Sequence, residues 1–109
     1  MTAPAATALV LVSHSRTLAE GVRELAAQMA GAGVPILAVG GLDDGSLGTD
    51  AAAIREAIEA ALAVAREAVV LFDLGSAYLN AATALDLLPE PQRRRVVLAD
   101  APLAEGAVI

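Results

Sequence analysis

The chain has 109 residues and a formal net charge of −6, and 57% of its residues are hydrophobic; this length favours one domain, residues 1–109, with its own core. It contains no cysteine, which excludes a disulfide framework, a cysteine-ligated zinc site and thiol catalysis. The acidic charge argues against nucleic acid or an anionic membrane as the main partner, and no apolar run reaches the roughly 18 residues of a membrane-spanning helix. Because the N-terminus also lacks the positive charge of a secretory signal, we expect the protein in the cytoplasm.

Four short apolar runs, rich in valine and leucine, predict β-strands. They are Ala8–Ser13, Pro35–Val39, Ala68–Asp73 and Arg95–Asp100. Continuous apolar runs, in contrast to alternating ones, are typical of strands that are covered on both faces.

The segments between these runs have the apolar spacing of helices. The expected stripes are Leu18, Val22, Leu25 and Met29; Ile54, Ile58, Leu62 and Ala65; and Tyr78, Ala82, Leu85 and Leu88. Gly31 is a stop signal for the first helix and Pro89 for the third. Thr49 or Asp50 can cap the second helix at its N-terminus.

This alternation predicts an α/β fold: a doubly wound, mostly parallel sheet of about four parallel strands, with helices on both faces. The expected strand order is 2-1-3-4. The chain stops at Ile109, a few residues into what could be a fourth helix that starts near Pro102. We therefore expect either a domain that lacks its last helix or strand, or a sheet face that an oligomer buries.

Small and polar residues collect directly after the predicted strands. In an open α/β sheet, ligands bind outside the carboxyl ends of the strands. The candidate segments are residues 13–16 (SHSR), 40–50, 73–77 (DLGSA) and 100–106.

His14, the only histidine, stands where the first strand turns into the first helix. A neutral imidazole can attack with one nitrogen while the other holds a proton, and a nucleophilic histidine can carry a phosphoryl group. The helix N-terminus beyond it favours a phosphate, and Ser13 and Ser15 add hydroxyl donors. The alternative is a surface or capping histidine with no catalytic role.

Asp73 ends the third strand, which neighbours the first strand in the expected order. Its carboxylate could accept the N–H of His14 and fix the tautomer of the imidazole; alternatively, it caps the helix that follows. Gly75 would let the backbone approach a ligand closely and Ser76 could donate to a phosphate, although both also fit an ordinary turn.

Other kinds of site have little support. The loop after the second strand has about ten residues, longer than usual, and could be a lid or a plain turn at Asp44. Asp43 and Asp44 are a weak indication of magnesium, so no metal site is predicted. The sequence has no G-x-S-x-G, Walker A or G-x-G-x-x-G motif. The run Arg93–Arg95 lies at the other end of the sheet and is interpreted as a solvated face.

Four segments, in this order, resemble a known family: VSHS (12–15), GTD (48–50), DLGSA (73–77) with the following ATALDLL (82–88), and APLAEGA (101–107). They are similar to the phosphotransferase subunit of the phosphoenolpyruvate-dependent dihydroxyacetone kinases, which is related to the mannose-type EIIA domains of the sugar phosphotransferase system. The resemblance covers essentially the whole chain, from the first strand to Gly106, although relatives continue through a further helix and a last strand.

The resemblance implies a phosphohistidine relay. The histidine of VSHS, here His14, would take a phosphoryl group from the carrier protein HPr and pass it to ADP on the nucleotide-binding subunit of the kinase, where the ATP formed phosphorylates dihydroxyacetone. The aspartate that pairs with this histidine corresponds to Asp73, and Thr49 and Ser76 would lie near the phosphate. The family also implies a homodimer, and a chain without a cofactor of its own because the nucleotide belongs to the partner subunit.

Two other functions stay open. The chain could be a mannose-type EIIA domain that feeds a sugar permease. It could also be a non-catalytic α/β regulatory or binding module, in which His14 only binds an anion or a partner.

Overall fold

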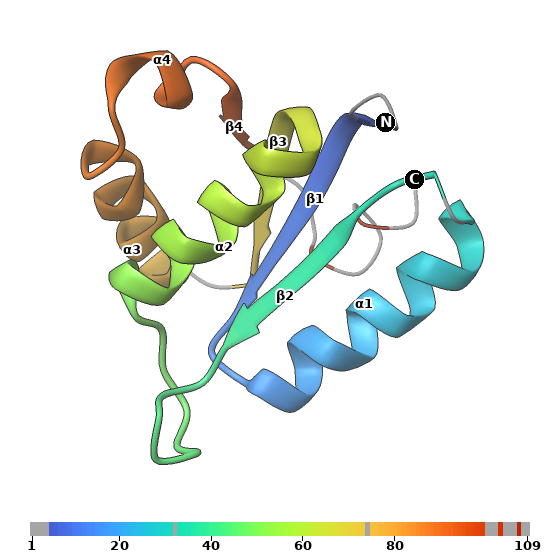
Figure 1. The fold of residues 1–109 in the computed structure, drawn as a ribbon. Coiled ribbons are helices and arrows are strands. Elements are labelled where there is room, and N and C mark those ends of the chain that lie inside the picture. Colours follow the sequence, from blue (N-terminus) through green and yellow to red (C-terminus); the bar gives the residue numbers. More distant parts are fainter. Residues whose placement is uncertain (1–4, 32, 74, 100–102, 104–106, 108–109) are drawn as a thin grey trace.

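The computed structural model describes residues 5–31, 33–73, 75–99, 103 and 107. Its elements, in chain order, are β1 (Ala5–Ser13), α1 (Arg16–Ala30), β2 (Ile36–Gly40), α2 (Ala51–Val64), β3 (Ala65–Phe72), α3 (Gly75–Asp86), α4 (Glu90–Arg93) and β4 (Val96–Leu98). Figure 1 shows helices on both sides of a central sheet. The α/β class is thereby confirmed.

The four strands form one parallel sheet in the order β2-β1-β3-β4. This is the predicted 2-1-3-4 order. Because all strands are parallel, their carboxyl ends meet at one edge of the sheet, the lower edge in Figure 1. The loops that leave β1, β2 and β3 all start from this edge, which is where the candidate segments 13–16, 40–50 and 73–77 lie.

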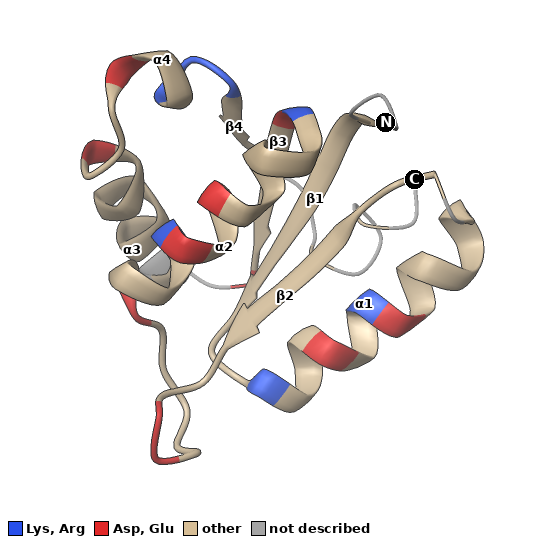
Figure 2. Cartoon of the chain, in the orientation of Figure 1, with Lys and Arg blue, Asp and Glu red and all other residues tan. Residues whose placement is uncertain are grey.

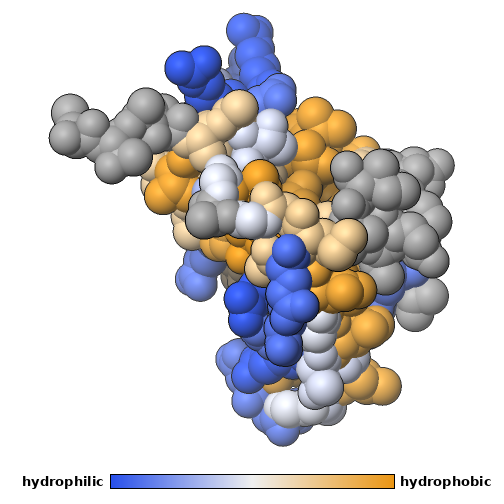
Figure 3. Space-filling view, turned by 90° about the vertical axis from the view of Figure 1, so that its right-hand side faces the viewer, coloured by the Kyte–Doolittle hydropathy of each residue, from blue (hydrophilic) through white to orange (hydrophobic). Residues whose placement is uncertain are grey.

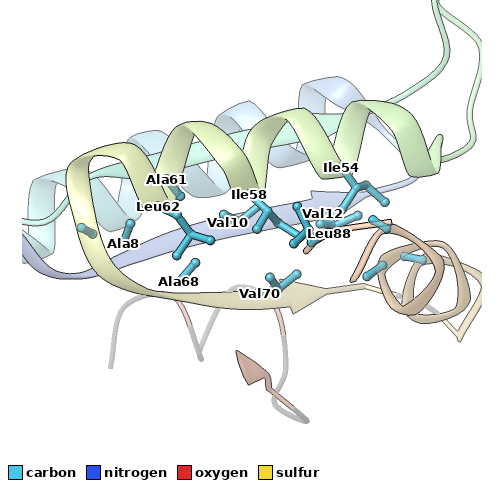
Figure 4. Packing of buried hydrophobic residues seen from close by; sticks show 14 residues of the cluster. Ala8, Val10, Val12, Ile54, Ile58, Ala61, Leu62, Ala68, Val70 and Leu88 are labelled. Atoms are coloured by element: carbon cyan, nitrogen blue, oxygen red, sulfur yellow. The ribbon is translucent and has the colours of Figure 1, made fainter. Parts of the chain in front are cut away.

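Each face of the sheet has its own apolar cluster. On one face, α2 and α3 pack on alternate residues of β1 and β3, and Figure 4 shows Ile54, Ile58 and Leu62 lying between α2 and these strands. On the other face, α1 packs on Leu11 of β1 and Leu71 of β3 together with Leu103 and Ala107. Leu103 and Ala107 are helical and buried. On this face, Leu103 and Ala107 therefore join α1 in covering β1 and β3.

The buried face of α1 differs from the predicted stripe. Of the four predicted residues only Val22 is buried, and it is joined by Ala19 and Ala26. Leu25 and Met29 are 49% and 67% exposed. Figure 3 shows hydrophobic and hydrophilic residues side by side on the face that is turned to the viewer. Alanine lets a helix backbone lie close to a sheet, so the small residues occupy the contact and the longer apolar chains lie at its border.

The buried face of α3 is shifted by about one residue from the stripe that the sequence predicts. Tyr78 is 44% exposed, whereas Ala77, Ala81 and Ala84 are buried against the sheet with Leu88. The second helix follows its predicted stripe at Ile54, Ile58 and Leu62, and Asp50 is its N-cap, as one of the two alternatives predicted. Ala65, the last member of that stripe, is the first residue of β3.

The arginine run 93–95 is only partly a solvated face. Arg94 is exposed and pairs with Glu90 of the short helix α4, which the sequence did not predict. Arg95, in contrast, donates from Nη2 to the carbonyl oxygens of Leu62 (2.8 Å) and Ala65 (2.9 Å). It therefore satisfies carbonyl groups where α2 ends, a place where a helix leaves acceptors without partners.

Charged residues lie on the helices, in the loops and at the start of β3, whereas β1 and β2 carry none (Figure 2). Among the described residues, no helix has the length and apolar character needed to cross a membrane.

Candidate active site

His14 lies directly after β1, two residues before α1 begins. The turn is fixed by Ser15, the N-cap of α1, whose Oγ accepts a hydrogen bond from the backbone N–H of Leu18 at 3.1 Å. A capping serine satisfies one of the N–H groups that the first turn of a helix leaves unpaired. The imidazole is thus held at the carboxyl edge of the sheet, with 20% of its side chain exposed.

Asp73, the first residue after β3, faces His14 across the pairing of β1 with β3. Its Oδ1 lies 3.0 Å from Nδ1 of His14, and its Oδ2 accepts from the backbone N–H of His14 at 3.1 Å. The structure therefore brings together the two residues that the expected strand order placed on neighbouring strands.

The carboxyl group of Asp73 has a pKa below its ordinary value of 3.8. Burial raises this pKa, but the hydrogen bonds from the His14 ring, the Ser13 hydroxyl and the His14 backbone lower it further than burial raises it. Hydrogen bonds donated to a carboxylate favour its charged form. Asp73 is consequently an anion at neutral pH, and it can act toward His14 only as an acceptor.

Ser13, predicted beside a phosphate, is the last residue of β1. Its side chain is fully buried, and its hydroxyl donates to Oδ2 of Asp73 at 2.8 Å. The hydroxyl oxygen of Ser13 in turn accepts from the backbone N–H of Ser15 at 3.0 Å. Ser13 therefore supports Asp73 from inside the fold, and its hydroxyl does not face the rim.

The loop that follows β2 folds back onto His14. Gly40, the last residue of β2, lies so close to β1 that a Cβ atom there would be 2.5 Å from the carbonyl oxygen of Ser13. Only glycine, which has no Cβ, fits there without a clash. Farther along the loop, the backbone N–H of Gly48 donates to the carbonyl oxygen of His14 at 2.8 Å. The long loop is thus tied directly to the candidate nucleophile.

Thr49 follows Gly48 and is joined to helix α3. The side-chain amide of Asn80 donates to the hydroxyl of Thr49 and lies 3.4 Å from its carbonyl oxygen. Asn80 is not among the predicted site residues. Two features of the sequence point to it: it is the only asparagine of the chain, and it lies four residues after Ser76, on the same side of the helix.

Gly75 and Ser76 form the start of α3. The predicted donation by Ser76 concerns a side chain that lies outside the described part of the structure, as does the region around Pro102.

Asp44 has a local role in the loop. Its Oδ1 accepts from the hydroxyl of Ser46 at 2.6 Å and from the backbone N–H of Ser46 at 2.9 Å. Both bonds lower the pKa of Asp44, and the bond from the hydroxyl has the larger effect. Together they form a turn in which the side chain of Asp44 takes the place of a backbone acceptor. Within the described residues, no three histidine, aspartate or glutamate side chains come together in a group that could hold a metal ion.

A pocket of about 260 Å³ lies beside the site, between the first turn of α1, the end of β2 and the start of α2. Arg16, Glu20, Asp43 and Asp50 line it, and Nε of Arg16 donates to the carbonyl oxygen of Gly40 at 3.3 Å. Neither His14 nor Asp73 lines this pocket, so it is a neighbour of the candidate site and not part of it.

Comparison with known proteins identifies the family. Residues 8–109 match the family EIIA-man, described as the PTS system fructose IIA component. The chain belongs to the mannose-type EIIA family. It is 44% identical to the phosphoryl donor subunit DhaM of PEP-dependent dihydroxyacetone kinase 2 from Listeria innocua, over 91% of this chain and 78% of that protein. The predicted resemblance to this group is confirmed.

Other relatives of this EIIA-type chain differ in length. A DhaM subunit of Providencia stuartii is 47% identical over 103 residues, which are 92% of this chain but 21% of that protein. The chain thus spans about a fifth of some relatives. A solved structure of a protein of unknown function, EF1359, superimposes with a TM-score of 0.85 and 40% identity, over 94% of this chain and 78% of that one. The EIIA fold is therefore shared well beyond the residues of the site.

Proposed function

We propose that this EIIA domain is a phosphohistidine carrier, in which His14 takes up a phosphoryl group and passes it on for the phosphorylation of dihydroxyacetone. The observation that carries the proposal is the 3.0 Å contact between Nδ1 of His14 and Oδ1 of Asp73 at the carboxyl edge of the sheet. Relatives named as phosphoryl donor subunits of dihydroxyacetone kinases support it. The domain is a carrier in this scheme, since it holds the group covalently between two partners.

Asp73 selects the nitrogen that reacts. An ionised carboxylate can only accept a hydrogen bond, so Nδ1 carries the proton and Nε2 presents its lone pair. Nε2 is therefore the proposed phosphoryl acceptor, with Asp73 fixing the tautomer and the direction of the ring. The approach of Nε2 to the phosphorus is then set before the partner arrives.

In the transfer, the bond between phosphorus and the donor group breaks and its electron pair stays on the donor, while the lone pair of Nε2 forms the new bond. The ring of His14 keeps the proton on Nδ1 and gains a positive charge. The Asp73 carboxylate, 3.0 Å from Nδ1, offsets that charge as it develops.

The phosphate needs donors around His14. The first turn of α1 begins two residues later, and the N-terminus of a helix favours an anion. We assign the hydroxyls of Ser15, Thr49 and Ser76, with the backbone at Gly75, to the phosphoryl oxygens. Ser13 acts on Asp73 instead, because its hydroxyl donates to Oδ2.

The partners follow from the family. The proposed donor is the phosphocarrier HPr, and the proposed receiver is ADP on the nucleotide-binding subunit of a dihydroxyacetone kinase. The nucleotide is a ligand of that subunit, so this chain would need no cofactor and no metal of its own. A homodimer in the cytoplasm is part of the same proposal.

A second candidate function is an EIIA domain that feeds a sugar permease, which the family description as a fructose IIA component favours. The chemistry at His14 is the same in both candidates. They differ only in the receiver of the phosphoryl group, and the receiver is what separates them experimentally.

The test begins with labelled phosphoenolpyruvate, Enzyme I and HPr, supplied to the wild-type protein and to His14→Ala. We expect an acid-labile, alkali-stable label on the wild type and none on the variant, with unchanged circular dichroism because His14 lies in a loop. Addition of the purified nucleotide-binding subunit with ADP should then remove the label and produce labelled ATP.

The other outcomes are distinct. Transfer to a permease component, with none to bound ADP, would support the second candidate. A folded wild-type protein that stays unlabelled while HPr is labelled would overturn the carrier role and favour a regulatory or binding module.

A further inference from the structure

Asn80 links helix α3 to the loop that carries Thr49. Its Nδ2 donates to Oγ1 of Thr49 and lies 3.4 Å from the carbonyl oxygen of the same residue. Both residues are partly buried. The same stretch of loop is also bonded to the site, because the backbone N–H of Gly48 donates to the carbonyl oxygen of His14 at 2.8 Å.

The carbonyl oxygen of Thr49 fixes which group donates in the two bonds between Asn80 and Thr49. A backbone carbonyl can only accept, so the amide nitrogen of Asn80, and not its oxygen, faces Thr49. Oγ1 of Thr49 is consequently the acceptor in the second bond. A hydroxyl that accepts through one lone pair has its hydrogen directed elsewhere, and the hydroxyl of Thr49 therefore remains able to donate.

We infer that Asn80 is a positioning residue of the phosphoryl-transfer site, which holds Thr49 with its hydroxyl hydrogen available to an oxygen of the phosphoryl group on His14. This inference rests on the proposed carrier function and deepens it. Asn80 does not touch the phosphoryl group itself. It acts through Thr49, whose neighbour Gly48 is bonded to the backbone of His14.

The contribution belongs to the transfer step. As phosphorus leaves the donor group and bonds to Nε2 of His14, negative charge redistributes over the three outer oxygens of the phosphoryl group. A donor whose hydrogen already points at one of these oxygens stabilises that charge without reorganising during the reaction. If Asn80 is lost, the hydroxyl of Thr49 turns among several acceptors, and part of this stabilisation is lost.

The experiment measures uptake of phosphoryl groups from phosphorylated HPr at varied HPr concentration. We expect Asn80→Ala to lower the maximal rate about ten-fold, with the KM for HPr little changed. Removing a donor that contacts the charge directly typically costs 10²–10³-fold, and Asn80 acts only through such a donor, so its loss should cost less. Thr49→Val should cost about a hundred-fold. A purely structural role of Asn80 would instead disturb docking and raise KM.

A double-variant cycle tests whether Asn80 acts through Thr49. In a Thr49→Val background, Asn80→Ala should change the maximal rate by less than two-fold. In a Thr49→Ser background, which keeps the hydroxyl, the ten-fold loss should persist. An equal loss in the valine background would overturn the inference, because Asn80 would then act by another route.

Asn80→Asp tests the direction of the hydrogen bond between residue 80 and the hydroxyl of Thr49, because it keeps the shape of the side chain. The new carboxylate cannot donate, so the hydroxyl of Thr49 would donate to it and turn away from the phosphoryl group. We expect the maximal rate to fall at least as far as in Asn80→Ala. This isosteric variant also keeps the test valid if Asn80→Ala unfolds.

Thr83→Ala is the matched control, since Thr83 lies on the same helix and its hydroxyl donates only within it, to the carbonyl oxygen of Leu79 at 3.0 Å. It should transfer at the wild-type rate. A labelled wild type with unaffected Asn80→Ala and Asn80→Asp overturns this inference alone. A wild type that takes no label overturns the carrier function and this inference with it.

Discussion

The two carboxylate oxygens of Asp73 have different hydrogen-bond partners. Oδ2 accepts from the hydroxyl of Ser13 and from the backbone N–H of His14, whereas Oδ1 faces Nδ1 of His14. Two fixed donors on one oxygen hold the carboxyl group in a single orientation. The imidazole is therefore aligned by a group that is itself aligned, an arrangement that preorganises a nucleophile.

This asymmetry predicts the effect of Asp73→Asn. The two donors at Oδ2 require an acceptor, so the amide oxygen takes that position and the NH₂ group faces Nδ1 of His14. Nδ1 must then accept, and the proton moves to Nε2, the proposed nucleophile. We expect phosphoryl uptake from HPr to slow on the order of 10²-fold or more, as in other sites where the wrong histidine tautomer is imposed.

The matched control for this change is Asp86→Asn, which makes the same substitution at an exposed residue at the end of α3. It should transfer at the wild-type rate. Wild-type rates in Asp73→Asn itself would remove Asp73 from the mechanism.

At the scale of the elements, the junction between β1 and β2 constrains the site most tightly. Gly40 lies against the carbonyl oxygens of Ser13 and Ser15, at 2.5 and 3.1 Å from the position that a Cβ atom would take. Both neighbours are backbone atoms, which cannot move aside as a flexible side chain can. The end of β2 and the start of the long loop are thus positioned by the same backbone that carries His14.

Gly40→Ala should destabilise the domain by about 1–3 kcal/mol, the usual cost of forcing an extra carbon into a packed region. It should also slow phosphoryl uptake, because the backbone around Ser13 and Ser15 must shift. Gly21→Ala is the control: it lies in α1 with open space around it, and alanine there should stabilise the helix by about 0.5–1 kcal/mol. Urea unfolding measures both, and equal stabilities of the two variants would contradict the close approach.

The elements also mark what the sequence could predict. Strand order placed His14 beside Asp73 because parallel strands rich in valine and leucine, alternating with helices, leave few topologies. The faces of α1 and α3 were less predictable, since periodicity weighs large residues most. In this alanine-rich chain the contacts are made by Ala19, Ala26 and Ala81, whereas long side chains such as Met29 are exposed.

The site shows the same division. His14 and Asp73, and Asp50 as one of two candidate caps, could be predicted from their positions after a strand or before a helix. The burial of Ser13 and the bond from Asn80 to Thr49 depend on how α3 and the loop pack against each other. No local pattern encodes a contact between residues that lie 31 positions apart.

At the scale of the whole molecule, the site joins three segments that are distant in sequence: the end of β1, the loop before α2 and the end of β3. The site therefore exists only in the folded domain. Its hydrogen bonds must contribute to folding as well as to chemistry, and the pKa of Asp73 makes that contribution depend on pH.

The folded-state pKa of Asp73 lies below its ordinary value of 3.8. A carboxyl group with a depressed pKa stabilises the fold at pH values above its unfolded pKa, and this stabilisation is lost as the pH falls through the folded pKa. The wild type should therefore have a higher unfolding free energy than Asp73→Asn at pH values above the ordinary pKa of Asp73. Below about pH 4 this difference should shrink, because protonated Asp73 no longer accepts three hydrogen bonds as an anion.

Urea unfolding of both proteins at a series of pH values measures this difference. Asp44, whose pKa is also lowered, is present in both proteins, so its contribution cancels in the subtraction. A difference that stays constant down to pH 3 would mean that the bonds from His14 and Ser13 do not favour the ionised carboxylate in the folded state. The proposed tautomer of His14 would then lose its physical basis, because a neutral carboxyl group could donate to Nδ1 as readily as accept from it.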